Sequence, residues 1–235
     1  MDLMHDFSQA LAVAFSMILS FDDGLVRIIG LSLRVSLSAV AIATLIGLPL
    51  GAAVAALSFP GRRAVAIALN TMMGLPPVVV GLVVYLLLSR SGPFGVLGLL
   101  FTPTAMIVAQ TVMIVPIVAS LARQTVEDLL VDYDDLLRVT GAGPLRRMAT
   151  LLSEARWSLV TTVLAGFGRA SAEVGAVMIV GGNIEHVTRV MTTAIALETS
   201  KGDLPMALGL GLVLMTLSLT VNLAASLLTE PPAKA

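Results

Sequence analysis

Two opposite charges, Arg169 and Glu173, lie four residues apart in the small and apolar stretch AGFGRASAEVGAVMIVGGN, residues 165–183. On a continuous helix this spacing places both side chains on one face. Burying an arginine at the centre of a membrane helix costs about 2.5–3.5 kcal/mol, whereas an i,i+4 ion pair contributes only about 0.2–0.5 kcal/mol in water. The pair is therefore no general stabiliser. It either fixes the register of packed helices or lines and gates a polar path.

The composition places this stretch in a membrane. Hydrophobic residues make up 57% of the 235 residues and charged residues only 12%, against about 25% charged residues in a typical soluble domain. The apolar residues form runs long enough to cross a hydrocarbon core of about 30 Å. With no cysteine and only two histidines, disulfides and a histidine- or thiolate-built metal site are not expected. We therefore expect an all-α polytopic membrane protein.

Five apolar stretches predict transmembrane helices, and the whole chain, 1–235, reads as a single transmembrane domain. Segment 7–20 is apolar but too short to span, which predicts a short N-terminal interfacial helix. Pro76 and Pro77 lie within the second predicted span and remove backbone donors there. They either unwind this span where a substrate passes or only kink it. The predicted spans are roughly 28–57, 64–88, 102–122, 157–180 and 204–228.

The lysines and arginines predict the orientation of these spans. The loops after the first and third spans and the C-terminal tail hold the larger share: Arg62, Arg63, Arg123, Arg138, Arg146, Arg147, Arg156 and Lys234. The opposite side holds Arg27, Arg90, Arg189 and Lys201. With five spans, this bias places the N-terminus outside and the C-terminus in the cytoplasm.

The long cytoplasmic segment 123–156 is predicted to form a helix, a glycine turn and a second helix. Gly141 is a helix-stopping residue, and Pro144 suits the first turn of the next helix. The segment either packs on its own membrane domain or docks a soluble partner. Apolar residues at helical spacing predict the inward faces of the two helices: Val126, Leu129, Leu130, Tyr133, Leu136, Leu137 and Thr140, then Leu145, Met148, Leu151, Leu152 and Ala155.

The segment DDLLRVTGAGPLRRMATLLSEA resembles the cytoplasmic loop signature of ABC importer permeases, in which Glu-Ala-Ala is followed by a glycine and an Ile-x-Leu-Pro ending. Asp135, Leu136 and Leu137 stand in place of Glu-Ala-Ala, and Gly141 follows. Leu151 stands in place of the isoleucine, but the closing Leu-Pro is absent. LPPVVVGLVVYLLL and GRASAEVGAVMIVGGNI resemble segments of molybdate and sulfate permeases. LLSEAR and the stretch 180–208 resemble tungstate permeases of that group.

This resemblance implies a type I ABC importer permease in a prokaryotic plasma (inner) membrane, which carries a tetrahedral oxyanion. Tungstate comes first, with molybdate and sulfate as alternatives. It also implies an extracytoplasmic binding protein and a separate cytoplasmic ABC ATPase dimer, which uses the ATP. The expected ATPase-coupling residues are Asp135, Leu136, Leu137, Gly141, Ala142, Gly143 and Leu145. The expected translocation path or gate holds Arg169, Glu173, Pro76 and Pro77.

Several other classes of protein fit the sequence less well. There is no GxxxxGK[ST] phosphate loop, so no ATPase site or cofactor is expected in this chain, nor any other catalytic site. No basic, aromatic-rich patch supports nucleic-acid binding. Since five spans are few to enclose a path in the lipid bilayer, we expect a homodimer with the path at its two-fold axis. A secondary transporter and a membrane scaffold subunit remain as alternatives. Asn183, Glu185, His186 and Arg189 either meet a delivery protein or form an ordinary hydrated loop.

Overall fold

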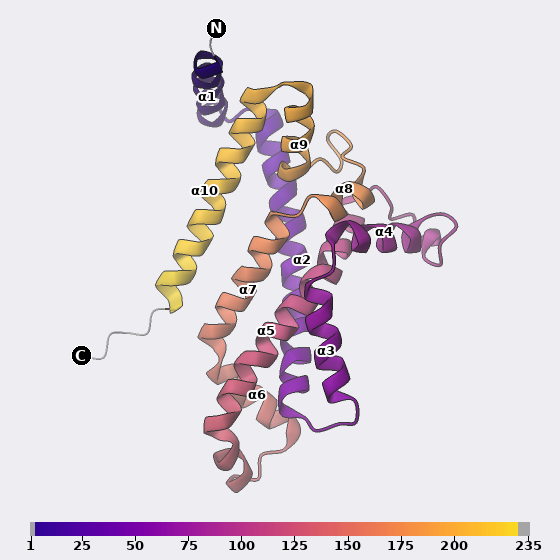
Figure 1. Ribbon diagram of the computed structural model, residues 1–235, viewed down its shortest axis with the longest axis vertical. Coiled ribbons are helices and arrows are strands. Elements are labelled where there is room, and N and C mark those ends of the chain that lie inside the picture. The colour runs from indigo at the N-terminus through magenta and orange to yellow at the C-terminus, as the bar shows by residue number, and fades with distance from the viewer. Residues whose placement is uncertain (1–2, 230–235) are drawn as a thin grey trace, which may run out of the picture. The chain divides into compact units, whose positions relative to one another are not determined.

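The computed structural model describes residues 3–229, and within that range the chain is α-helical with one short 3₁₀ helix and no strand (Figure 1). The predicted cytoplasmic Lys234 lies outside the described residues. The elements in chain order are α1 (Leu3–Leu19), α2 (Asp23–Ala56), α3 (Arg62–Met73), α4 (Pro77–Leu88), η1 (Gly95–Leu97), α5 (Pro103–Val139), α6 (Pro144–Glu154), α7 (Arg156–Ser171), α8 (Gly175–Gly181), α9 (Met191–Lys201) and α10 (Leu204–Thr229).

Three helices, α2, α5 and α10, are each long and apolar enough to cross a membrane. Two further pairs, α3 with α4 and α7 with α8, meet the same criterion together, although each pair is bent at a short break. Counting each bent pair as one span gives five, as the sequence predicts. The N-terminal segment is helical as expected, and α1 is not among these spans.

Two compact units make up the chain. The first unit comprises Met1–Ser38, Pro77–Gln110 and Ser171–Thr220, and the second comprises Ala39–Pro76, Thr111–Ala170 and Val221–Ala235. The long helices α2, α5 and α10 each contribute to both units, whereas α4, α8 and α9 belong to the first unit and α3 and α6 to the second.

In the first unit, α1, α9, α10 and the start of α2 share an apolar core. Leu25, Met191 and Leu210 are buried at its centre. The hydroxyl of Ser32 donates to the carbonyl of Ile28 and accepts a hydrogen bond of 2.7 Å from the backbone N–H of Met191. This bond satisfies a donor at the first turn of α9, so the polar Ser32 ties α9 to α2 at low cost.

In the second unit, the end of α2 packs against α5 and α6. Ala52, Val126, Leu137 and Leu151 are buried together in this core. A second cluster joins α3 to α2 and α5 through Leu69. The helix–turn–helix therefore belongs to a packed core and is no free loop.

The structure differs from the sequence-based spans in three places. The helix expected to begin the cytoplasmic segment is a continuation of the third span, since α5 runs unbroken from Pro103 to Val139. The second and fourth spans are each interrupted, at residues 74–76 and 172–174. An additional helix, α9, lies in the segment that the sequence treats as an outer loop. The sequence of α9 contains no separate apolar run that is long enough to predict a helix there.

Candidate functional site

The starts of α4 and α8 lie against each other in the first unit. A Cβ on Gly81 would come within 2.7 Å of the Cα of Ala176, so only glycine allows this approach. A Cβ on Gly175 would likewise come within 2.8 Å of a methyl group of Val78. Figure 1 shows α8 beside α4. Small residues therefore bring the helix that follows the first break into contact with the helix that follows the second.

The expectation that Arg169 and Glu173 share one face of a continuous helix is wrong. Arg169 lies in the last turn of α7, and Glu173 lies in the break before α8. Each charge has the sign that suits its helix end, because a helix C-terminus carries partial negative charge and an N-terminus partial positive charge. The sequence spacing suggested an i,i+4 pair on one helix, but the helix ends between the two residues.

Glu173 is buried, with only 3% of its surface exposed, and both its side chain and its backbone carbonyl accept hydrogen bonds. Its carboxylate oxygen Oε1 accepts a hydrogen bond of 2.9 Å from the backbone N–H of Ala176 in the first turn of α8. Its backbone carbonyl accepts a hydrogen bond of 2.7 Å from the hydroxyl of Thr192 on α9. Glu173 thus supplies the acceptor that the interrupted backbone needs and connects α8 to α9.

The first break follows from the proline pair. Pro77 is the first residue of α4, where its missing N–H leaves no intrahelical bond unmade. Pro76 is exposed and lies just before it, outside either helix. Of the two readings of this pair, the structure therefore shows an interruption of the span and not a kink within one helix.

The turn between α5 and α6 has the geometry expected around Gly141. Gly141 adopts a φ of +63°, which favours glycine. The backbone N–H of Gly141 donates to the carbonyl of Arg138 at 3.0 Å, and that of Ala142 donates to Leu137 at 3.1 Å. This pair of bonds is a Schellman motif, which ends α5 and reverses the chain. Gly143 is extended and Pro144 begins α6, as predicted.

The apolar faces of this helix–turn–helix are only partly buried. Leu137 and Leu151 are buried as expected, and Met148 packs against their cluster. Leu136 and Leu145 were expected to face inward but are 57% and 81% exposed. Val139, between them in the sequence, is 87% exposed. The turn therefore presents large apolar side chains to its surroundings, which is unusual for a segment rich in charge.

Arginine–carboxylate pairs hold α3 and α6 to α5. The carboxylate of Glu127 on α5 is bound by Arg62 of α3 at 3.0 Å and by Arg123 at 2.5 Å. The carboxylate of Asp134 is bound by Arg138 at 2.8 Å and by Arg147 of α6. All of these residues except Arg123 line a groove of about 640 Å³, which Asp135 also lines. Much of the positive charge in this segment is thus neutralised within the second unit.

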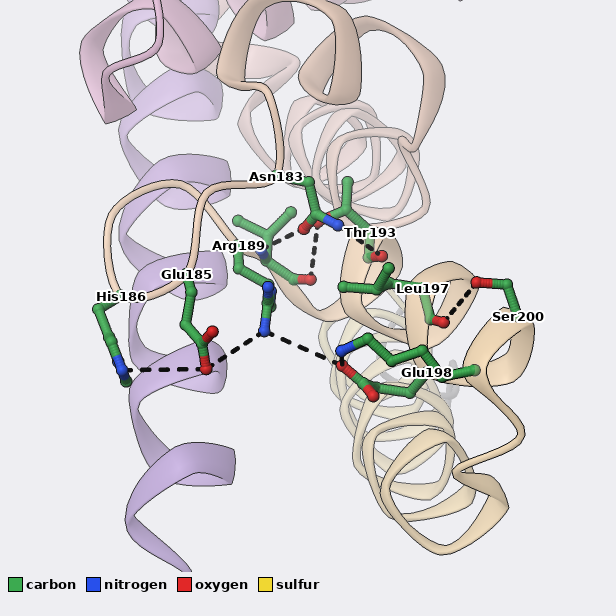
Figure 2. Close-up of polar contacts among 10 residues, drawn as sticks. Asn183, Glu185, His186, Arg189, Thr193, Leu197, Glu198 and Ser200 are labelled. Carbon is green, nitrogen blue, oxygen red and sulfur yellow. Dashed lines mark hydrogen bonds and ion pairs between the residues drawn. The ribbon is translucent and has the colours of Figure 1, made fainter.

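The segment 182–190 is a compact, internally bonded loop in the first unit. The buried hydroxyl of Thr188 donates to the carbonyl of Gly181 at 2.6 Å and accepts from the backbone N–H of Ile184 at 2.9 Å. Figure 2 shows Arg189 pointing between Glu185 and Glu198, with His186 at the outer end of the chain of contacts. The sequence singled out Asn183, Glu185, His186 and Arg189, but not Thr188 or Glu198. Among the side chains that the structure describes, residues 11–224, no group of three or more His, Asp or Glu could hold a metal ion.

Apolar helices long enough to cross a membrane, two interrupted spans and a helix–glycine turn–helix define a multi-pass membrane protein. The family described as "Binding-protein-dependent transport system inner membrane component" matches residues 47–230. The chain belongs to this family.

Individual relatives, whose names state what they transport, add detail to this family assignment. The chain is similar to the "Tungstate uptake system permease protein TupB" of Peptoclostridium acidaminophilum, at 41% identity over 93% of this chain and 96% of that protein. It is 44% identical to the "Probable anion ABC transporter permease protein" of Haloferax volcanii, over 84% of this chain and 88% of that protein. A "Sulfate transport system permease protein CysW" of Synechococcus elongatus is more distant, at 28% identity over 72% and 62%.

Proposed function

We propose that this chain is the membrane-spanning permease subunit of an ABC importer that carries a tetrahedral oxyanion, with tungstate as its substrate. The tungstate uptake permease that resembles it is 41% identical over nearly the whole length of both chains. Sulfate permeases align at 28% or below, which makes sulfate the weaker choice, and molybdate stays an alternative because it shares tungstate's charge and shape. An extracytoplasmic binding protein delivers the anion and supplies most of the selectivity.

The observation that carries the coupling role is the exposed apolar surface at the turn between α5 and α6. Leu136, Val139 and Leu145 are exposed here, on either side of Gly141. Water-exposed apolar side chains gathered on one turn indicate a protein contact, and residues 135–145 include every coupling position that the family resemblance implies. We propose that a cleft of a separate ATPase binds this turn.

The continuous helix α5 is the element that carries movement from this turn into the membrane. Its 37 residues correspond to about 55 Å of helix. The arginine pairs on Glu127 and Asp134 make α3, α5 and α6 respond together. Two copies of the chain, related by a two-fold axis, complete the path, and closure of the ATPase dimer draws their turns together in an alternating-access cycle.

The two interrupted spans are our proposed border of the path. A break inside a span leaves backbone groups and charges that lipid cannot solvate, so such breaks occur where protein or water satisfies them. Arg169 and Glu173 lie at one break, and Pro76 and Pro77 at the other. We propose that these helix ends meet the passing anion or gate its passage. With the N-terminus outside, the turn around Gly141 then faces the cytoplasm of a prokaryotic cell.

Capture of the cognate ATPase tests the coupling assignment. The substitution Leu145→Asp places a charge on an exposed apolar side chain, so the permease is expected to fold normally and to lose most of its ATPase during co-purification. Leu145→Met, which keeps the position apolar, is the matched control and is expected to retain the ATPase. Equal ATPase recovery with the aspartate and methionine variants would remove the turn from the interface. It would return the scaffold and secondary-transporter alternatives to consideration.

A further inference from the structure

A cavity of about 580 Å³ lies in the first unit, between the start of α2 and the segment that runs from the outer loop to the start of α10. The charged side chains that carry the argument are Arg27, Arg34, Arg189 and Lys201, together with Glu185 and Glu198. We propose that this cavity is a binding site for a tetrahedral oxyanion group, held chiefly by Arg34 and Arg189. It is distinct from the path residues at the helix breaks and from the ATPase-binding turn.

Arg189 has hydrogen-bonding capacity that the protein does not use. Its side chain is only 14% exposed, and its Nη1 lies 3.6 Å from Glu185 Oε1 and 3.9 Å from Glu198 Oε1. Both distances are too long for hydrogen bonds. Within the described part of the chain its buried Nε also has no partner. A largely buried guanidinium that makes two long ion pairs and no hydrogen bond keeps donors with which it can bind a further anionic group.

The carboxylates near Arg189 are engaged elsewhere or lie in solvent. Glu198 accepts a hydrogen bond of 3.0 Å from Lys201 Nζ, so its Oε1 is shared with a second cation. Asp203, which also lines the cavity, accepts from the backbone N–H of Met206 at the start of α10. Glu185 is well exposed and contacts Arg189 only at long range (Figure 2). The acids therefore steady the site without filling the arginine donors.

Arg34 supplies a second guanidinium, and its position on α2 indicates how deep in the membrane the cavity lies. Across residues 3–229 it makes neither a hydrogen bond nor an ion pair, and it is exposed. No charged residue follows it on α2 through Ala56. That uncharged run is long enough, at about 1.5 Å per residue, to fill a hydrocarbon core of about 30 Å. Arg34 consequently lies at the membrane surface, on the side predicted to face outward.

The positive charge gathered there runs against the general distribution of cations. Only Arg27, Arg90, Arg189 and Lys201 are predicted in the loops of the outer side, and three of these four line the cavity. Basic residues are normally scarce on that side. With Arg34 the lining holds four cations against the carboxylates of Glu185, Glu198 and Asp203, which leaves one net positive charge to attract an anion. Arginine forks match the oxygens of a tetrahedral anion in pairs, which gives geometric as well as electrostatic selection.

The same chemistry is offered by two sources, a free oxyanion such as tungstate and the phosphate of an anionic lipid headgroup. The expectation that tungstate binds here rests on the proposed function, whereas the expectation that a lipid headgroup binds here does not. The test uses the full chain in nanodiscs of phosphatidylcholine alone, titrated with sodium tungstate and read by calorimetry. A second set replaces part of the phosphatidylcholine with phosphatidylglycerol and reads the apparent melting temperature without tungstate. Both sets compare the wild type with Arg34→Gln and with the control Arg90→Gln.

If the site takes a free oxyanion, tungstate binds in the neutral nanodiscs, Arg34→Gln weakens its Kd about tenfold or more, and Arg90→Gln leaves it unchanged. If the site takes a headgroup, tungstate does not bind, and phosphatidylglycerol raises the melting temperature of the wild type and of Arg90→Gln but not of Arg34→Gln. Arg34→Gln is the decisive variant because Arg34 is exposed and makes no contact that the fold needs. Arg189→Gln is expected to act in the same direction.

Binding of neither probe, or binding that is equal in Arg34→Gln and the wild type, would overturn the proposal. Uptake by the wild-type permease with its ATPase and binding protein is measured separately. A wild type that moves no tungstate would contradict the proposed function and leave a headgroup site standing. A wild type that transports tungstate, combined with unchanged binding in Arg34→Gln, would remove the cavity site alone.

Discussion

Arg169 and Glu173 owe their places to the ends of two helices. A suitably charged side chain at a helix end contributes about 0.3–1 kcal/mol, and a capping hydrogen bond about 1 kcal/mol. These terms offset part of the cost of placing charged residues among apolar helices. The break at which the two residues lie is also the place where we propose that they border the path.

The cap made by Glu173 gives a prediction at the residue scale. Glu173→Ala removes the acceptor for the backbone N–H of Ala176 and is expected to destabilise the protein by about 1 kcal/mol. Glu173→Gln keeps an acceptor oxygen at that place and is expected to preserve most of the stability while reducing uptake. The apparent melting temperature and tungstate uptake of the two variants check this separation.

Glu154→Gln is the matched control, since Glu154 is exposed and its side chain makes no hydrogen bond or ion pair within the described part of the chain. It should leave the melting temperature unchanged. An alanine variant as stable as the wild type would show that the cap is dispensable. A glutamine variant with normal uptake would show that the negative charge has no part in transport.

Among the elements, α6 carries one leucine that stabilises the fold and another that we propose contacts the ATPase. Leu151 is fully buried against α2 and α5, whereas Leu145 is exposed. Leu151→Ala leaves a cavity and is expected to lower the free energy of unfolding by about 2–5 kcal/mol. Leu145→Ala shortens an exposed side chain and leaves no cavity, so this variant should keep the wild-type melting temperature while its ATPase binding is weakened. Similar melting temperatures for the two variants would contradict the observed orientation of α6.

The contact between α4 and α8 makes a second prediction for elements. Gly81→Ala places a methyl group within 2.7 Å of the Cα of Ala176, a backbone atom that cannot turn aside. The expected cost is about 1–3 kcal/mol of stability, seen as a lower melting temperature. Gly211→Ala on α10 is the control, because its methyl group would meet no atom within 4 Å. Equal melting temperatures of both variants would mean that α4 and α8 do not pack this closely.

Sequence patterns identified the helical elements well where apolar runs were long, and less well where backbone chemistry decides. The turn at Gly141 and the start of α6 at Pro144 were predicted, because glycine and proline have direct backbone consequences. The break at residues 172–174 was not, since it depends on the hydrogen bonds that Glu173 makes after folding. The helix α9 was missed for a related reason: Thr192 and Glu198 find their partners only in three dimensions.

The exposed side chains of the turn at Gly141 show a further limit of periodicity. Leu136 and Leu145 share the helical spacing of the buried residues, and spacing alone cannot distinguish a core position from a surface position. The structure shows that both leucines are exposed. The proposed role of Arg34 could not be predicted from the sequence either, because its cavity includes residues from the distant segment 185–206.

At the scale of the whole molecule, one chain supplies two interrupted spans, the turn that we propose binds the ATPase and the cavity that we propose binds an oxyanion group. Much of α10 lies at the surface of the chain, with exposed apolar side chains at Met215, Leu219 and Leu223. Such a surface suits lipid or a second copy of the chain, in agreement with the proposed homodimer. The assembly is thus expected to need two permeases, an ATPase dimer and a binding protein before any anion moves.

Tungstate accumulation in proteoliposomes that contain the permease with its cognate ATPase and binding protein tests the coupling of this chain to an ATPase. Uptake is expected to require ATP, to persist in Leu145→Met and to be lost in Leu145→Asp although the variant is folded. Uptake without ATP, or undiminished uptake by the Leu145→Asp variant, would contradict the coupling of this chain to an ATPase through the turn at Gly141.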